Sequence, residues 1–242
     1  MNADAILAVD GLSAWYGAAQ ILYAVELAVG RGEVVALMGR NGAGKSTTMK
    51  AIMGLIDRRR GSVRFDSHDI STLEPYRIAR LGLGFTPEDR RIFSGLTVME
   101  NLDVGRQRPR ASAGPAASAW TPDRLFALFP NLAERRHHRG SELSGGEQQM
   151  LTVARTLMGN PLAVLFDEPS EGVAPLIVEQ MAATIVELKQ QGLSILLSEQ
   201  NIHFAELVAD RVYVLEKGQI RWHGGMAALM REDDVQRAFL TV

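Results

Sequence analysis

The hydrophobic pattern of this chain changes period several times between its ends. Glu33–Met38 is almost wholly apolar, which is typical of a strand buried on both faces. Short runs with β-type composition predict further strands at Leu83–Thr86, Ala163–Phe166 and Ser194–Ser198. Helical patterns fall between them, at Lys45–Leu55, Pro75–Leu81, Leu176–Lys189 and Ile202–Val208. Strands that alternate with helices in this way predict an α/β fold with a parallel sheet.

Both ends of the chain carry a different, antiparallel signal. Near the N-terminus, short strands are expected at Ile6–Val9, Val25–Val29 and Ser62–Phe65, the last one preceded by a polar break at Arg58–Gly61. Near the C-terminus, two runs flank the turn Lys217-Gly218 and predict a hairpin, Arg211–Glu216 with Gln219–His223, followed by two short helices. The expected architecture is therefore a mixed sheet with an N-terminal antiparallel part.

The middle of the chain is helical. Thr97 with Glu100, and Ser144 with Glu147, have the spacing of capping boxes, which predicts helix starts there. Further helices are expected at Pro122–Phe129 and Leu132–His138, and a loop at Arg106–Thr121. We therefore expect one chain with an α/β core, residues 1–86 plus 161–242, and a helical insert at 87–160.

Composition narrows the classes of function. The chain has 242 residues, no cysteine and a formal net charge of −2. Without cysteine there is no disulfide scaffold, no thiolate metal site and no thiol nucleophile. A near-neutral charge argues against a dedicated nucleic-acid binder. No apolar run reaches the roughly 18 residues of a membrane span.

A glycine-rich turn follows the first buried strand. It has the pattern G-x-x-x-x-G-K-S/T, in which backbone N–H groups form an anion cradle at a helix N-terminus, the lysine reaches the β- and γ-phosphates and the hydroxyl binds Mg²⁺. Its residues are Gly39, Arg40, Asn41, Gly42, Ala43, Gly44, Lys45, Ser46 and Thr47. The turn predicts a nucleotide site.

Two carboxylates end the strand at 163–166. Because ligands bind at the carboxyl ends of strands in open α/β sheets, Asp167 and Glu168 are expected beside the phosphate loop. In a nucleotide enzyme, Asp167 would hold Mg²⁺ and Glu168 would polarise the attacking water.

A second candidate anion site lies at the start of the capped helix. It comprises Ser144, Gly145, Gly146 and Glu147. Two phosphate-binding helix starts in one chain are reconciled by a head-to-tail dimer, in which each nucleotide lies between the phosphate loop of one chain and the capped helix of another.

GRNGAGKST, LSGGEQ and VLFDEP, in this order, resemble the nucleotide-binding subunits of ABC transporters over essentially the whole chain. The resemblance implies the ABC ATPase fold, ATP and Mg²⁺ as ligands, and the roles assigned above. It also implies that Tyr16 stacks on adenine, with Trp15 on the opposite face of its strand. Glu88 stands where most members have the glutamine that reaches Mg²⁺, and Gln200 stands where most have a histidine that contacts the γ-phosphate.

PEDRRIF, DEPSEGVAP and SEQN are similar to the branched-chain (hydrophobic) amino-acid uptake subfamily, and the chain resembles the shorter ATPase of the pair found there. This implies a peripheral subunit on the cytoplasmic face of the inner membrane. Its partners would be a second ABC ATPase, identical or homologous, two permease subunits and an extracytoplasmic substrate-binding protein, with no nucleic acid.

Other functions stay open at this point. Importers of urea or short amides have very similar ATPases. Gln200 cannot titrate near neutral pH, so a non-transport module gated by nucleotide binding is a further alternative. Chromosome-maintenance clamps are disfavoured because they carry a long coiled coil between these motifs, and translation-associated members because they carry two motif sets in one chain.

Overall fold

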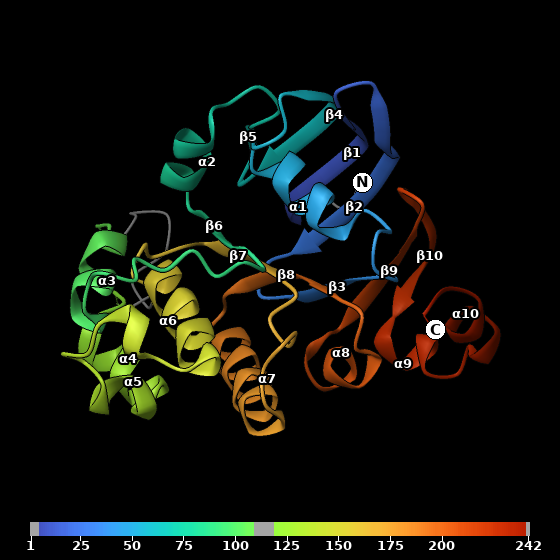
Figure 1. Ribbon diagram of the computed structural model, residues 1–242. Helices are drawn as coiled ribbons and strands as arrows, with labels where there is room; N and C mark the ends of the chain where they lie inside the picture. The colour runs from blue at the N-terminus through green and yellow to red at the C-terminus, as the bar shows by residue number, and fades with distance from the viewer. Residues whose placement is uncertain (1–4, 109–118, 241–242) are drawn as a thin grey trace.

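The computed structural model of the protein describes residues 5–108 and 119–240. Its larger sheet has six strands in the order β10-β9-β3-β8-β7-β6 (Figure 1). All neighbouring pairs in it are parallel except β9 and β10, which form the expected hairpin. These strands are β3 (Val34–Met38), β6 (Leu83–Thr86), β7 (Ala163–Asp167), β8 (Ser194–Glu199), β9 (Arg211–Glu216) and β10 (Gln219–Gly225).

The smaller sheet is antiparallel, with the strand order β2-β1-β4-β5. Its strands are β1 (Ala5–Tyr16), β2 (Ala19–Gly30), β4 (Arg58–Phe65) and β5 (His68–Asp69). The polar break expected at Arg58–Gly61 is wrong, because these residues pair with β1, with Arg58 opposite Trp15. Its arginines are tolerated within a strand because β4 is largely solvent-exposed over this stretch.

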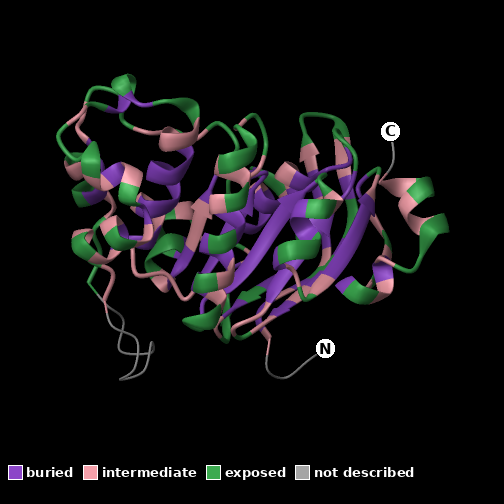
Figure 2. Ribbon diagram, turned by 90° about the horizontal axis from the view of Figure 1, so that it is seen from below, coloured by how far each residue is buried: buried purple, intermediate pink, exposed green. Residues whose placement is uncertain are grey.

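Alternation along β3 explains how one sheet serves two hydrophobic cores. Val34, Ala36 and Met38 pack in the core formed with α6 and α7, while Val35 and Leu37 pack in the core shared with the smaller sheet and α1. Every residue of β3 is buried. Figure 2 shows burial concentrated in such strands, with exposed residues on the outer faces of the helices.

Helices cover both faces of the larger sheet, and a group of helices lies beside one of its ends (Figure 1). They are α1 (Lys45–Ile52), α2 (Pro75–Leu81), α3 (Val98–Gly105), α4 (Pro122–Leu128), α5 (Pro130–Glu134), a short 3₁₀ helix (Gly140–Glu142), α6 (Gly145–Leu157), α7 (Pro175–Gln190), α8 (Ile202–Val208), α9 (Met226–Leu229) and α10 (Asp233–Phe239). Among the described residues, no helix combines the length and apolar character needed to cross a membrane.

The segment between β6 and β7 forms the helical unit on the left of Figure 1. Both capping boxes are present, with reciprocal bonds between Thr97 and Glu100 and between Ser144 and Glu147. The helix expected at Leu132–His138 is wrong at its end, since α5 stops at Glu134. The backbone carbonyls beyond it accept bonds from the first turn of α3 instead. Of the loop expected at Arg106–Thr121, residues 109–118 lie outside the described residues.

Candidate nucleotide site

The glycine-rich turn connects the buried strand β3 to α1, as its sequence predicts. Gly44, the residue before the helix, has a φ of 110°, and a Cβ there would lie 2.9 Å from Leu22 Cδ2. Only glycine fits both conditions without strain. The turn therefore presents bare backbone N–H groups at the start of α1, where a helix attracts anions.

Lys45 is the first residue of α1 and is almost fully buried. Its ammonium donates hydrogen bonds to the carbonyls of Gly39 at 2.7 Å and Arg40 at 3.2 Å. It also pairs with Glu168 Oε1 at 3.0 Å, with side-chain exposures of 3% and 6%. The glycine-rich turn thus holds the Lys45 ammonium beside the carboxylate of Glu168, the residue that follows β7.

Asp167 ends β7 and lies beside Ser46 on α1. Ser46 and Ser198 both donate their hydroxyls to Asp167 Oδ1, at 2.9 Å and 2.7 Å. The other oxygen, Oδ2, is buried without a hydrogen-bond partner among the described residues. Burial raises the pKa of the Asp167 carboxyl, against the two serine hydroxyls, which lower it. A buried carboxylate with one free oxygen next to a serine hydroxyl is a donor set that suits Mg²⁺.

Glu168 has a left-handed backbone, with a φ of 49°. Ser198 holds this conformation, since its carbonyl accepts from the Glu168 amide at 3.1 Å and its hydroxyl lies 3.2 Å from the same nitrogen. The second carboxylate oxygen, Oε2, is buried and accepts no hydrogen bond from a described donor. Strained backbone and an unsatisfied carboxylate together are typical of a functional position.

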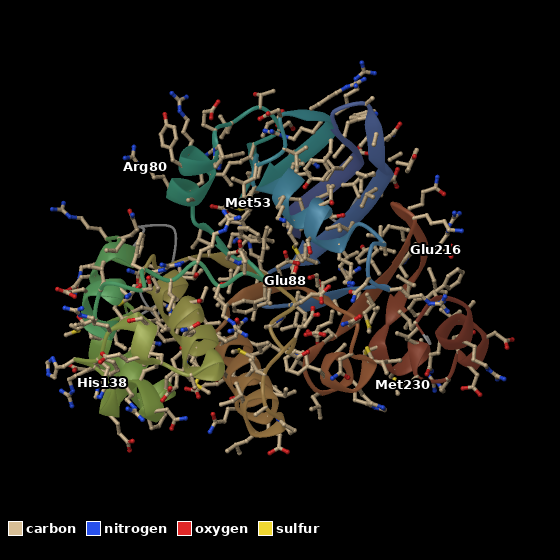
Figure 3. The ribbon with its side chains drawn as sticks, viewed as in Figure 1. Met53, Arg80, Glu88, His138, Glu216 and Met230 are labelled. Atoms are coloured by element: carbon tan, nitrogen blue, oxygen red, sulfur yellow. The ribbon has the colours of Figure 1, made fainter. Side chains whose placement is uncertain are left out.

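Lys45, Ser46 and Glu168 line one cavity of about 370 Å³, whereas Asp167 lies outside its lining. The residues that line it are Tyr16, Ile21, Asn41, Gly42, Gly44, Lys45, Ser46, Thr47, Glu88, Glu168 and Glu171. Of the other predicted loop residues, Gly39 and Arg40 hold Lys45, and Ala43 is buried and accepts a bond from the Gly218 amide at 2.8 Å. Figure 3 labels Glu88 in the loop that runs between the helical unit and the sheets.

Tyr16 and Trp15 have different surroundings, as strand alternation requires. Tyr16 is 49% exposed and lines the cavity. Trp15 lies under two arginines, with the guanidinium carbons of Arg58 and Arg60 4.9 Å and 5.8 Å from its ring centroid. Tyr16 is therefore the aromatic ring that a base in this cavity could contact.

Sequence reasoning missed several acidic and hydroxyl groups of the site. Glu171 lines the cavity, and its pKa is raised to about 7 by hydrogen bonding with the Glu168 carboxyl, then by burial and by the charges of Glu168 and Glu88. Ser198 is the penultimate residue of β8, the neighbour of β7, so the rule that carboxyl ends of parallel strands meet could have found it.

The switch segment, residues 198–201, joins the end of β8 to the start of α8. Gln200 is exposed and does not line the cavity. The preceding residue, Glu199, is 1% exposed, accepts bonds from the amides of Ser170 at 3.1 Å and Asn201 at 3.2 Å, and has a pKa raised by burial. The contact between Gln200 and a γ-phosphate therefore stays a prediction.

The second candidate anion site is separate from this cavity. Ser144 and Gly145 are exposed at the start of α6, and none of the residues Ser144–Glu147 lines the cavity. The structure thus keeps the two sites of one chain apart, as a head-to-tail pairing of two chains requires.

A family model described as "ABC transporter" matches residues 22–171. The chain belongs to the ABC transporter family. This ABC subunit is 40% identical, over 97% of its length and 99% of the relative, to the high-affinity branched-chain amino acid transport ATP-binding protein BraG of Pseudomonas aeruginosa. It is 34% identical to the lipopolysaccharide export system ATP-binding protein LptB of Haemophilus influenzae, with 97% of each chain covered.

Solved structures agree with this placement of the ABC chain. An ATP-binding subunit of an ABC transporter is 31% identical, with a TM-score of 0.79, and the match covers 97% of this chain and 96% of that one. An ATP-binding cassette of another ABC transporter is 28% identical with a TM-score of 0.78, covering 96% of both. The expected fold and the expected enzyme class, an ABC ATPase, are confirmed.

Proposed function

We propose that this chain hydrolyses ATP to drive the uptake of branched-chain or other hydrophobic amino acids through separate membrane subunits. Support for the substrate comes from the similarity to BraG over almost the whole of both chains. Support for the chemistry comes from one observation above all, the buried contact of Lys45 with Glu168 at 3.0 Å in a cavity lined by the phosphate loop.

The loop amides and Lys45 would bind the phosphates of ATP, with adenine on Tyr16. Mg²⁺ would be held by Ser46 and Asp167, with Glu88 nearby, and when bound it supplies charge neutralisation between the β- and γ-phosphates. Glu168 would accept a proton from the water that attacks the γ-phosphorus, while the bond to the bridging oxygen of ADP breaks. Catalysis would rest on positioning and electrostatics.

A second copy or a homologous ATPase would complete each site with Ser144, Gly145, Gly146 and Glu147. The functional division would be the one expected from the sequence, with an ATP-binding core at 1–86 plus 161–242 and a helical signature unit at 87–160. In this arrangement the start of α6 faces a nucleotide held by the other chain, which accounts for its exposure at a distance from the chain's own cavity.

A groove of about 640 Å³ supports docking to permease subunits. Four of the eight large hydrophobic side chains that are exposed in the described part of the chain line it: Leu55, Tyr76, Phe93 and Val104. Patches of this kind mark interaction surfaces. Met53 and Arg80, which also line the groove, are labelled in Figure 3. This chain would lie peripherally on the cytoplasmic face of the inner membrane, bound to the permease subunits, with an extracytoplasmic binding protein delivering substrate.

The test is uptake by proteoliposomes that contain this chain, its permease subunits and its binding protein. We expect ATP-dependent uptake of labelled leucine, and its loss when Lys45→Ala replaces the native chain. Uptake of urea or a short amide instead of leucine would reassign the substrate. ATP binding without any coupled hydrolysis or uptake would favour the non-transport module that Gln200 raises as an alternative.

A further inference from the structure

Arg90 lies between the two halves of the proposed site. A Cβ built on Gly145 would be 3.0 Å from Arg90 Nη1 and 3.6 Å from its Cζ, so the guanidinium rests directly on the first residue of α6. A Cβ on Gly172 would be 3.9 Å from Arg90 Nη2. The side chain therefore sits beside the exposed helix start and close to the loop that follows Glu168.

The backbone of Arg90 is held in place by strong local constraints. Its φ is 60°, and its amide donates to the carbonyl of Pro87 at 3.2 Å. Its carbonyl accepts the hydroxyl of Thr152 at 3.0 Å, and Thr152 is fully buried in α6. A non-glycine residue in the left-handed region is uncommon and costs free energy. These contacts fix the backbone of Arg90 to α6, with its side chain beside Gly145 at the start of that helix.

Within residues 5–108 and 119–240, the Arg90 guanidinium has no hydrogen bond and no ion pair. The adjacent carboxylate of Asp89 is taken by Arg91, at 2.8 Å. Glu147, the acid of the helix start, accepts from the Ser144 amide at 2.7 Å and lies 3.6 Å from Arg135. A guanidinium has five donors. Arg90 is half-buried, and its guanidinium donors are available to an acceptor from outside the chain.

Charge at the start of α6 indicates which acceptor fits. A helix N-terminus carries partial positive charge, but here the Glu147 carboxylate occupies it through the capping box. Arg90 restores a full positive charge next to the exposed Gly145 backbone. Arginine and bare amides together match a phosphate group. Arg90 does not line the cavity that contains the chain's own phosphate loop, which favours a phosphate from another copy.

We infer that Arg90 binds the terminal phosphate of the ATP held by the Lys45 loop of the partner copy. This inference rests on the proposed function and adds a residue to the partner-facing half of the site. It also explains why residue 145 is a glycine, since a side chain there would displace the Arg90 guanidinium. Arg90 would act only in the ATP-bound dimer, whereas Lys45 acts already in the single chain.

The test measures two steps separately with the full chain carrying Glu168→Gln, which slows hydrolysis. Isothermal titration with Mg²⁺ and ATP at low protein concentration reports binding to the single chain, and sedimentation reports ATP-dependent dimers. We expect Arg90→Ala to weaken dimerisation by about tenfold or more, the loss of one charge-assisted contact, with unchanged ATP binding to the single chain. Arg90→Lys should recover part of the loss. Arg91→Ala, which removes a neighbouring ion-paired arginine, is the matched control and should dimerise like the parent.

Several outcomes would overturn the inference. Dimerisation of Arg90→Ala at the parent's ATP concentration would remove Arg90 from the site, and weaker ATP binding by the single chain would place its action within its own chain. A parent chain that binds ATP yet stays monomeric would overturn the Arg90 inference alone. A parent chain that binds no ATP would refute the proposed function itself.

Discussion

Replacing Glu168 by glutamine separates the two tasks of this residue. At 3.0 Å, the Coulomb attraction between Lys45 and Glu168 is about 5.5 kcal/mol with an effective dielectric constant of 20. Glutamine still accepts a hydrogen bond from the ammonium, and burial of a carboxylate is relieved. We therefore expect a net loss of about 2 kcal/mol in the free energy of unfolding without nucleotide, and a Tm lower by roughly 5 °C.

The rate of ATP hydrolysis by Glu168→Gln should be affected more strongly than its stability. Loss of a general base costs about 10²- to 10⁴-fold, which corresponds to roughly 3–5 kcal/mol in the activation free energy. ATP binding should persist, because Lys45 pairs with the phosphates when ATP binds. In Glu168→Gln, Lys45 does not have to break an ion pair with a carboxylate before it binds them. Added ATP should therefore raise the Tm of Glu168→Gln at least as much as that of the native chain.

The assays are phosphate release in the assembled complex and thermal unfolding of the chain with and without Mg²⁺ and ATP. Glu179→Gln is the matched control, since it makes the same chemical change at an exposed position of α7. Turnover of Glu168→Gln within tenfold of the native rate would refute the role of Glu168 as the base. Failure of ATP to raise its Tm would refute the account of Lys45.

Two further predictions concern the rim of the cavity. Tyr16→Ala should raise the KM for ATP about tenfold through lost stacking on the base, while Trp15→Ala, the control, should leave KM unchanged; equal effects in steady-state assays would contradict this. Glu171 has a pKa raised from 4.5 to about 7, so its stabilising contribution is present below 4.5 and is lost as the pH rises through about 7. The Tm of the nucleotide-free native chain should therefore drop relative to Glu171→Gln between about pH 5 and about pH 8, and parallel Tm curves would count against the raised pKa of Glu171.

Features encoded by short-range spacing were predictable. The phosphate turn, both capping boxes and the apolar strands each depend on residues within a few positions of one another, where backbone sterics and helix-end hydrogen bonding decide the outcome. The same holds for Tyr16 and Trp15, because a strand places neighbours on opposite faces. Local physics is sufficient for these elements.

Features that depend on distant partners were not predictable in the same way. Arg58–Gly61 reads as a break but is a strand, because β1 supplies the pairing partner. Glu199 turns inward to the Ser170 amide, 29 residues away, and Gln200 is left exposed. Each outcome requires the folded neighbourhood, which sequence periodicity does not contain.

The separation of the two anion sites has a consequence for symmetry. In a two-fold dimer, one interface creates two equivalent composite sites, so every residue of the α6 start serves a nucleotide bound by the other chain. A substitution at Lys45 in one chain and one at Arg90 in the other would then damage the same composite site. A mixed dimer of Lys45→Ala and Arg90→Ala chains retains one fully native site, whereas neither homodimer retains any. If Arg90 acted on its own chain's nucleotide, the mixed dimer would retain none, so the two geometries differ in the number of intact sites and not merely in degree.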